Sequence, residues 1–201
     1  MGKSLKIFLG EAVLALAVLG LYRLSRPGIS EQAPSIVPGV GTGLIEYSDF
    51  QCPACGVYYP IIKALQQEFG ESIVFVYRNF PLRQIHANAD LAARSAEAAG
   101  KQGKFWEMHD MIFENQKDWA SQSNAKKSMI EYAQSLNLDA ERFKTDLDSK
   151  EVKEKVNNDY LSGIQAKVNA VPTFFLNGTK LQNPESYEEF KKLLEEAILK
   201  V

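Results

Sequence analysis

The most continuous apolar pattern in the chain lies near its N-terminus. Residues 7–22 are almost entirely apolar, with Glu11 as the one charge, lysines before the run and arginines after it. Such a run between basic residues is typical of an export signal or a membrane anchor. Because the only small-x-small cleavage pattern, Ala15 and Ala17, lies inside the run, we expect residues 1–24 to form an uncleaved signal anchor, a transmembrane helix. A cleaved signal peptide is the alternative.

A polar stretch follows, and then shorter apolar segments appear. Residues 25–42 are rich in proline and glycine, which predicts a spacer between the membrane and a domain. Residues 44–47 and 73–77 are dominated by β-branched, aromatic and aliphatic side chains, as in buried strands. Residues 52–69 have the length of a helix, and Gly70 ends it. The sequence therefore predicts a strand, a helix and a second strand as a βαβ unit.

The pattern of the middle of the chain is helical throughout, from about residue 86 to residue 168. Apolar residues there recur at helical spacing, which is far more typical of a packed core than of a cofactor site. The clearest stripe recurs every four residues and consists of Val152, Val156, Tyr160, Ile164 and Val168.

Strand character returns near the C-terminus. Residues 173–176 predict a strand, and Asn177-Gly178 is a dipeptide that favours a tight hairpin turn into a second strand at 179–181. A last amphipathic helix is expected from about Ser186. This ββα pattern follows the βαβ unit and the helical region, so residues 43–201 are expected to form one α/β domain with a helical insertion at about 86–168.

Composition narrows the function classes. The chain has 201 residues, with 23 Lys and Arg against 25 Asp and Glu, so its formal charge of −2 gives no support for nucleic acid as a partner. It has only two cysteines. A domain of this size can bury enough core without disulfides, so we expect this pair to be reactive instead of structural.

The two cysteines form the motif Cys52-Pro53-Ala54-Cys55 at the predicted start of a helix. Their sulfurs would lie one helical turn apart, and the helix N-terminus would stabilise Cys52 as a thiolate. Proline is favoured in the first helical turn, where it needs no hydrogen-bond partner.

A lone C-x-x-C motif also occurs in zinc and iron–sulfur sites, or as a chance pair in a core. A metal site needs further ligands, and the two histidines, His86 and His109, lack the spacing of zinc modules. We expect no metal site, and we assign the two histidines no role beyond packing or surface positions.

Three separated motifs closely resemble the DsbA-like thiol–disulfide oxidoreductases of the thioredoxin superfamily. They are EYSDFQCPAC at 46–55, VFVYRNFPL at 74–82 and VPTFFLNG at 171–178. The resemblance extends over 44–199, and it implies a thioredoxin fold (βαβ…ββα) with a helical insertion between its two halves.

The resemblance also implies roles for individual residues. Cys52 would be the nucleophile and Cys55 the resolving cysteine of a redox-active disulfide. Pro172 would follow a cis peptide bond, and the Val171 backbone would pair with an incoming peptide, in a small version of strand addition. Glu46 matches the position of an acidic residue under the active site, which makes it a candidate proton acceptor for Cys55. The alternative for Glu46 is a solvated charge on an edge strand.

Features around the active site bear on the direction of the reaction. A valine directly before Pro172 is similar to the oxidase branch of the family. The Pro53-Ala54 dipeptide lacks the histidine that helps to stabilise the thiolate in the best-known oxidases. Asn169 and Ala170 stand where relatives often carry glycine.

The resemblance and the anchor together predict a single-pass protein of the cell membrane with an extracytoplasmic catalytic domain. We expect a dithiol oxidase that introduces disulfides into cysteine-containing exported proteins, needs no cofactor and is re-oxidised by a membrane protein of the DsbB or VKOR-like type. A reductase or isomerase of the same fold is the alternative. A less favoured alternative, outside the enzymes, is a non-catalytic peptide-binding or chaperone module.

Overall fold

The computed structural model of the protein describes residues 42–200. The predicted signal anchor, residues 1–24, and nearly all of the predicted spacer lie outside the described residues. Among the helices of the described part, none has the length and apolar character needed to cross a membrane.

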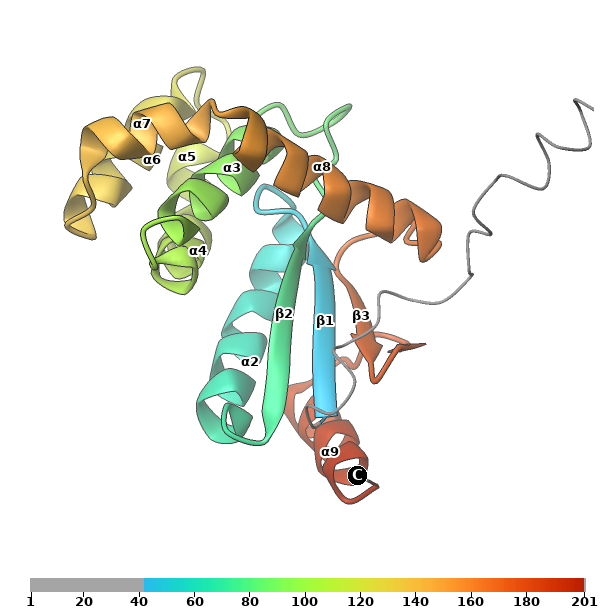
Figure 1. Ribbon diagram of the computed structural model, residues 1–201. Helices are drawn as coiled ribbons and strands as arrows, with labels where there is room; N and C mark the ends of the chain where they lie inside the picture. The colour runs from blue at the N-terminus through green and yellow to red at the C-terminus, as the bar shows by residue number, and fades with distance from the viewer. Residues whose placement is uncertain (1–41, 201) are drawn as a thin grey trace, which may run out of the picture. The chain divides into compact units, whose positions relative to one another are not determined.

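A four-stranded sheet forms the centre of the domain (Figure 1). Its order is β2 (Ile73–Asn79), β1 (Thr42–Ser48), β3 (Thr173–Leu176) and β4 (Thr179–Lys180). β1 pairs in parallel with β2 and antiparallel with β3, and β3 pairs antiparallel with β4. Because β1 has a strand on both sides and all seven of its residues are buried, its side chains face the interior whichever way they point.

Side chains of β1 alternate between the two faces of the sheet, and different helices cover each face. Leu44 packs in one apolar cluster with residues of α2 (Pro53–Phe69) and α9 (Tyr187–Ile198). Ile45 belongs to a second cluster with Phe175 and Val168 on the opposite face. This alternation places the even-numbered residues of β1, including Glu46, on the face that α2 covers.

Six helices follow β2 and precede β3 in the chain, and they enclose an apolar core of their own, in which Met108, Trp119 and Phe143 are buried. This core is continuous with residues at the end of β1 and the start of α2, including Phe50 and Cys55. The helices are α3 (Ala89–Gly100), α4 (Phe105–Glu114), α5 (Gln116–Trp119), α6 (Ala125–Ser135), α7 (Ala140–Leu147) and α8 (Lys150–Gln165). The predicted thioredoxin-like α/β fold is therefore confirmed for the described residues.

The predicted stripe on α8 is only partly buried. Val152 and Val156 are in the core, but Ile164 is 49% exposed. An α-helix turns 100° per residue, so positions four apart drift around the helix by about 40° at each step. The buried face instead passes through Asp159 and Gly163, which a search for apolar residues misses.

Candidate active site

The two cysteines lie where the loop after β1 enters α2. Cys52 caps the N-terminus of the helix with extended backbone angles, and Pro53 occupies its first turn. Cys55 is fully buried, and Cys52 retains 8% exposure. Both are free thiols. The helix start therefore presents one sulfur toward the surface and keeps the other inside.

The environment of Cys52 favours its thiolate. A hydrogen bond from the Cys55 thiol is the main cause that lowers the pKa of Cys52 to about 6, and the backbone N–H groups of Cys55 and Ala54 act in the same direction. Burial and the charge of Asp49 oppose this shift. Cys52 is therefore largely ionised at neutral pH without any histidine between the cysteines.

The environment of Cys55 has the opposite effect. Burial raises the pKa of Cys55 well above its usual value, and the neighbouring Cys52 raises it further. The backbone N–H of Asp49 donates to the Cys55 sulfur at 3.5 Å, which opposes the rise. Cys55 therefore keeps its proton at neutral pH, and it needs a proton acceptor before it can act as a nucleophile.

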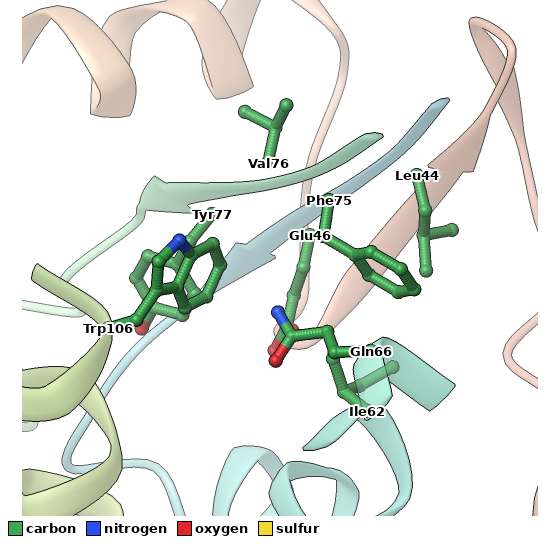
Figure 2. Close-up of a pocket in the computed structure, with 8 residues that line it drawn as sticks. All are labelled: Leu44, Glu46, Ile62, Gln66, Phe75, Val76, Tyr77 and Trp106. Carbon is green, nitrogen blue, oxygen red and sulfur yellow. The ribbon is translucent and has the colours of Figure 1, made fainter. Parts of the chain in front are cut away.

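Glu46 is buried beneath the active site and is not a solvated edge charge. It lies on the central strand, pairs in register with Tyr77 and is 7% exposed. Burial raises the pKa of Glu46 to about 7, and the Ser48 side chain opposes this rise. Glu46, Gln66 and Trp106 line a cavity of about 10 Å³ between the sheet, α2 and α4 (Figure 2). A carboxyl group with a pKa near neutrality is suited both to accept and to release a proton.

The loop before β3 covers Cys52. The Val171–Pro172 peptide bond is cis, the form that the family resemblance implies. The Cys52 thiol lies 3.8 Å from the carbonyl oxygen of Val171 as a weak donor. The Asn183 side chain donates to the Pro172 carbonyl oxygen at 2.7 Å and holds the loop from its other side. Backbone next to the proline therefore lies directly beside the sulfur that would meet a substrate.

Buried Asp49 and half-buried His86 form a pair that fixes the loop before the cysteines, a role that sequence analysis did not predict. The Asp49 carboxylate accepts hydrogen bonds from the backbone N–H groups of Gln51 and Leu82, at 2.8 and 2.9 Å. His86 Nδ1 lies 2.7 Å from the same carboxylate. These contacts tie the end of β1 to the segment after β2. The bridging role of Asp49 and His86 can be identified only from the hydrogen bonds of the folded loop.

The helical insertion also holds the active-site loop. The Gln116 side chain of α5 donates to the carbonyl oxygens of Phe50 and Cys52, at 2.7 and 2.9 Å. Gln51 donates to the carbonyl oxygen of Ala120 and accepts from the backbone N–H of Asn88, both at 2.7 Å. These contacts join residues 37 to 69 positions apart in the chain, so no local pattern could have indicated them.

His109 lies in a cluster of aromatic rings. It is buried against Phe50, Tyr77 and Phe113 with ring centroids 4.8–5.5 Å apart. Burial lowers the pKa of His109, so it is a neutral packing residue at pH 7. Within residues 42–200, no group of three or more His, Cys, Asp or Glu side chains is placed to hold a metal ion.

Comparisons with known proteins agree with this architecture. A family model described as thioredoxin matches residues 42–196. The chain is 34% identical over 145 residues to the Na(+)/H(+) antiporter NhaA 3 of Salinispora tropica, a match that covers 72% of this chain and 21% of that protein. The Na(+)/H(+) antiporter NhaA 1 of Salinispora arenicola is 36% identical over 137 residues, with 68% and 20% covered. The chain thus spans about a fifth of the length of these curated relatives.

Solved structures share the fold over nearly their whole length. Oxidised BdbD from Bacillus subtilis is 24% identical with a TM-score of 0.70, and the match covers 86% of this chain and 96% of that chain. The oxidoreductase DsbA from Xylella fastidiosa is 15% identical with a TM-score of 0.70, with 86% and 92% covered. The family match over most of the chain and these likenesses in structure lead to one conclusion: the chain belongs to the thioredoxin family, and its described domain has the fold of the DsbA-type thiol–disulfide oxidoreductases.

Proposed function

We propose that this protein is an extracytoplasmic protein thiol–disulfide oxidoreductase that works as a dithiol oxidase through the Cys52–Cys55 pair. The observation that carries the proposal is the contrast between the two sulfurs. Cys52 lies at the helix N-terminus with its pKa lowered to about 6, whereas burial holds the pKa of Cys55 well above its usual range. One thiolate that retains some exposure beside one fully buried thiol is an arrangement suited to thiol–disulfide exchange.

The reaction begins with the Cys52–Cys55 disulfide. A substrate thiolate attacks the Cys52 sulfur, the bond between the two cysteines breaks, and Cys55 leaves and takes up a proton. A second substrate thiolate then attacks the substrate sulfur of the mixed disulfide and displaces Cys52 as a thiolate. Two electrons pass from the substrate to the cysteine pair, so the substrate leaves with a disulfide and the protein is left as a dithiol.

Stabilisation of the Cys52 thiolate favours the oxidase direction. A thiolate that is a better leaving group makes the reduced protein more stable and the disulfide a stronger oxidant, by about 30 mV for each tenfold change in equilibrium constant. The pKa of Cys52 is lowered from 9 to about 6, which is a thousandfold change in its acid dissociation constant. Thiolate stabilisation of this size can raise the reduction potential of the cysteine pair by at most on the order of 90 mV.

Substrate peptides would bind beside Pro172. The carbonyl oxygen of Val171 lies 3.8 Å from the Cys52 sulfur, so an extended peptide bound to that backbone would bring its own cysteine to Cys52. Cysteine-containing exported proteins are the substrates that this arrangement suits. Val171 and Pro172 therefore form the proposed substrate-binding segment.

We place the protein at the cell membrane, with residues 1–24 as a signal anchor and the domain on the extracytoplasmic side. The support is the apolar run between basic residues. The oxidase must be re-oxidised after each cycle, and a membrane protein of the DsbB or VKOR-like type would be close to an anchored domain. The curated relatives are named as Na(+)/H(+) antiporters, but the match covers about a fifth of their length, so we do not extend ion transport to this chain.

The deciding measurement is the reduction potential of the Cys52/Cys55 couple in the full chain, by equilibration with glutathione buffers. We expect a potential well above that of thioredoxin, which is about −270 mV. A value at or below that of thioredoxin would contradict the oxidase proposal and favour a reductase that receives electrons from a membrane donor.

A second measurement separates an enzyme from a peptide-binding module. Cys52→Ser removes the nucleophile and leaves the Val171–Pro172 segment in place. We expect this variant to lose all disulfide formation in a reduced test protein such as ribonuclease. Unchanged biological activity of Cys52→Ser in cells would contradict the enzymatic role and favour the binding module.

A further inference from the structure

Ser48, the last residue of β1, has a buried hydroxyl group close to the active-site cysteines that has no role in the exchange steps described above. Its side chain is 1% exposed, and the hydroxyl oxygen makes no hydrogen bond to any other described residue. The hydroxyl of Tyr77 on the neighbouring strand is also buried without a partner. A buried hydroxyl without a partner destabilises a folded protein relative to a satisfied one. Two such groups next to a redox site therefore call for a functional explanation.

The position of Ser48 places it between the buried thiol and the buried carboxyl. Ser48 and Glu46 are two residues apart on β1, so their side chains point to the same face of the sheet, toward α2. Cys55 lies in the first turn of α2, and the residue after Ser48 donates its backbone N–H to the Cys55 sulfur. Burial raises the pKa values of Cys55, Glu46 and Tyr77, and the Ser48 side chain is close enough to all three to oppose that rise.

The three neighbours match the hydrogen-bonding capacity of one serine hydroxyl, which has one donor and two acceptor positions. Cys55 and Tyr77 can each donate to the Ser48 oxygen, and Glu46 can accept its hydrogen. In resting enzymes such catalytic hydrogen bonds are often long, and they shorten only in the reacting complex.

From this arrangement we propose that Ser48 is a catalytic proton relay, which carries the proton of Cys55 to Glu46, with the Tyr77 hydroxyl holding Ser48 in place. The relay deepens the proposed function and rests on it, since it describes how the same cysteine pair opens and closes.

The relay operates when Cys55 attacks the mixed disulfide between Cys52 and a partner sulfur. The Cys55 S–H proton passes to the Ser48 oxygen as the Ser48 O–H proton passes to the Glu46 carboxylate. The Cys55 sulfur forms its bond to Cys52, the bond from Cys52 to the partner sulfur breaks, and the partner leaves with the electron pair as a thiolate. When the disulfide opens in the oxidase direction, the same groups return a proton from Glu46 to Cys55.

The structure also offers an outlet for the proton beyond Glu46. The cavity beside the Glu46 carboxyl is partly open to solvent, and its volume of about 10 Å³ is close to the smallest that can hold one water molecule (Figure 2). Gln66 and Trp106 also line this cavity, and Trp106 is 38% exposed. A proton on Glu46 can thus exchange with solvent without passing back through Cys55.

The test follows the Cys55-dependent step in the full chain. The reduced protein is mixed with oxidised glutathione, and two rates are recorded: formation of the Cys52–glutathione mixed disulfide and its resolution by Cys55. For Ser48→Ala we expect resolution to slow by at least tenfold at pH 7, because general base assistance contributes about 10² to 10⁴ in rate. In the wild type, the resolution rate plotted against pH should have an inflection near pH 7, where Glu46 titrates. We expect Ser48→Ala to lack this inflection. Formation of the mixed disulfide should change less than twofold, since Cys52 is untouched.

Three further variants make the result specific. Ser48→Thr keeps a hydroxyl and should recover most of the rate and the inflection. Thr42→Val removes another buried, unpartnered hydroxyl from the same face of β1, at its far end, and should leave both rates unchanged. Glu46→Gln should also remove the inflection, and the double variant Glu46→Gln/Ser48→Ala should be no slower than the slower single variant, because the two groups act in series.

The proposal is overturned if Ser48→Ala resolves the mixed disulfide at the wild-type rate with the inflection intact, or if the two substitutions slow the step multiplicatively. Failure of the proposed function gives a different result, a reduction potential of the Cys52/Cys55 couple at or below that of thioredoxin, which does not depend on how fast Cys55 resolves the mixed disulfide. If Ser48→Ala does not fold, Ser48→Thr and Glu46→Gln still test the proposal. Resolution of the mixed disulfide at the wild-type rate in Glu46→Gln would show that the Glu46 carboxyl does not receive the proton.

Discussion

The outer and inner sides of the active site control their sulfurs by different means. On the outer side, Cys52 is stabilised as a thiolate by the Cys55 thiol and by backbone N–H groups of the first helical turn. On the inner side, Cys55 is kept as a thiol by burial and by the neighbouring Cys52, and Ser48 of the sheet is close to it. Backbone amides are present at every helix start, whereas Ser48, Glu46 and Tyr77 are specific side chains on two strands.

This difference separates two chemical tasks. Nucleophilicity at Cys52 needs only the helix N-terminus and its partner thiol, so the Pro53-Ala54 dipeptide can lack a histidine and still leave a thiolate at neutral pH. Proton movement at Cys55 needs a group with a matched pKa, and only the folded sheet brings one close. Substitutions on the two sides should therefore have different signatures.

The largest effect is expected from the cysteines themselves. Cys52→Ser should abolish exchange, because no thiolate remains at the surface. Cys55→Ser should retain the attack by Cys52 and accumulate mixed disulfides with substrate, because nothing resolves them. Non-reducing gel electrophoresis after acid quenching measures both. Equal trapping by the two variants would contradict the assignment of nucleophile and resolving residue.

The second effect concerns the thiolate of Cys52. In the reduced protein we expect its absorbance at 240 nm to titrate with a midpoint at about pH 6. Cys55→Ala removes the strongest hydrogen bond to the thiolate and should move the midpoint upward by at least one pH unit. Cys55→Ser keeps a donor at that position and serves as the matched control, with a smaller shift. A midpoint that is the same in all three proteins would show that the helix backbone alone sets this pKa.

The third effect is a pH dependence of stability from Glu46. Its pKa is raised from 4.5 to about 7 in the folded protein, so the folded state holds a proton that the unfolded state has already released. The resulting stability is fully present below pH 4.5 and is lost as the pH rises through 7. Between pH 4 and pH 8 this amounts to about 3 kcal/mol, at about 1.4 kcal/mol per unit of pKa shift.

Glu46→Gln should remove this loss. The free energy of unfolding, measured by urea titration of the oxidised protein, should fall less steeply with pH in the variant than in the wild type. The oxidised form is chosen because its cysteines do not titrate. Parallel stability curves for the two proteins between pH 4 and pH 8 would show that Glu46 is not buried as described.

The smallest effect is expected at the contact between the insertion and the outer side. Gln116→Ala removes two hydrogen bonds to the backbone before α2, and we expect a loss of about 1–2 kcal/mol in the free energy of unfolding. The rate of Cys52 alkylation should change by less than tenfold, because the amides of the first helical turn remain. Gln134→Ala, at an exposed position of α6, is the control and should lie within about 0.5 kcal/mol of the wild type.

Much of the fold was predictable because its signals are local. The strand, helix and strand that carry the cysteines, the helical insertion and the final hairpin and helix each have their own pattern. The last helix begins at Ser186 as expected, and the Ser186 side chain accepts a hydrogen bond from the backbone N–H of Glu189. The predicted stripe on α8 was less accurate, because Asp159 and Gly163 on its buried face carry no apolar signal. Gly163 is required there because a Cβ would meet the Phe80 ring at 2.5 Å.

The candidate site was predictable in part. Cys52 and Cys55 stand out by their spacing, and the family resemblance supplied Glu46, Val171 and Pro172. The pair of Asp49 and His86 was missed, as were Gln116 and the hydroxyl of Ser48. Each of these residues is of a common type at an unremarkable position, and its importance arises from a partner that lies elsewhere in the chain.

The sequence by itself determined which residues can react and which elements they occupy, because spacing, helix capping and strand periodicity act over a few residues. Only the tertiary structure decided how those residues ionise. The pKa values of Cys52, Cys55 and Glu46 depend on burial and on groups that pairing of β1 with β2 and packing of α2 bring within a few ångströms. Desolvation and hydrogen bonding act through space at short range, so they are set only once the chain has folded.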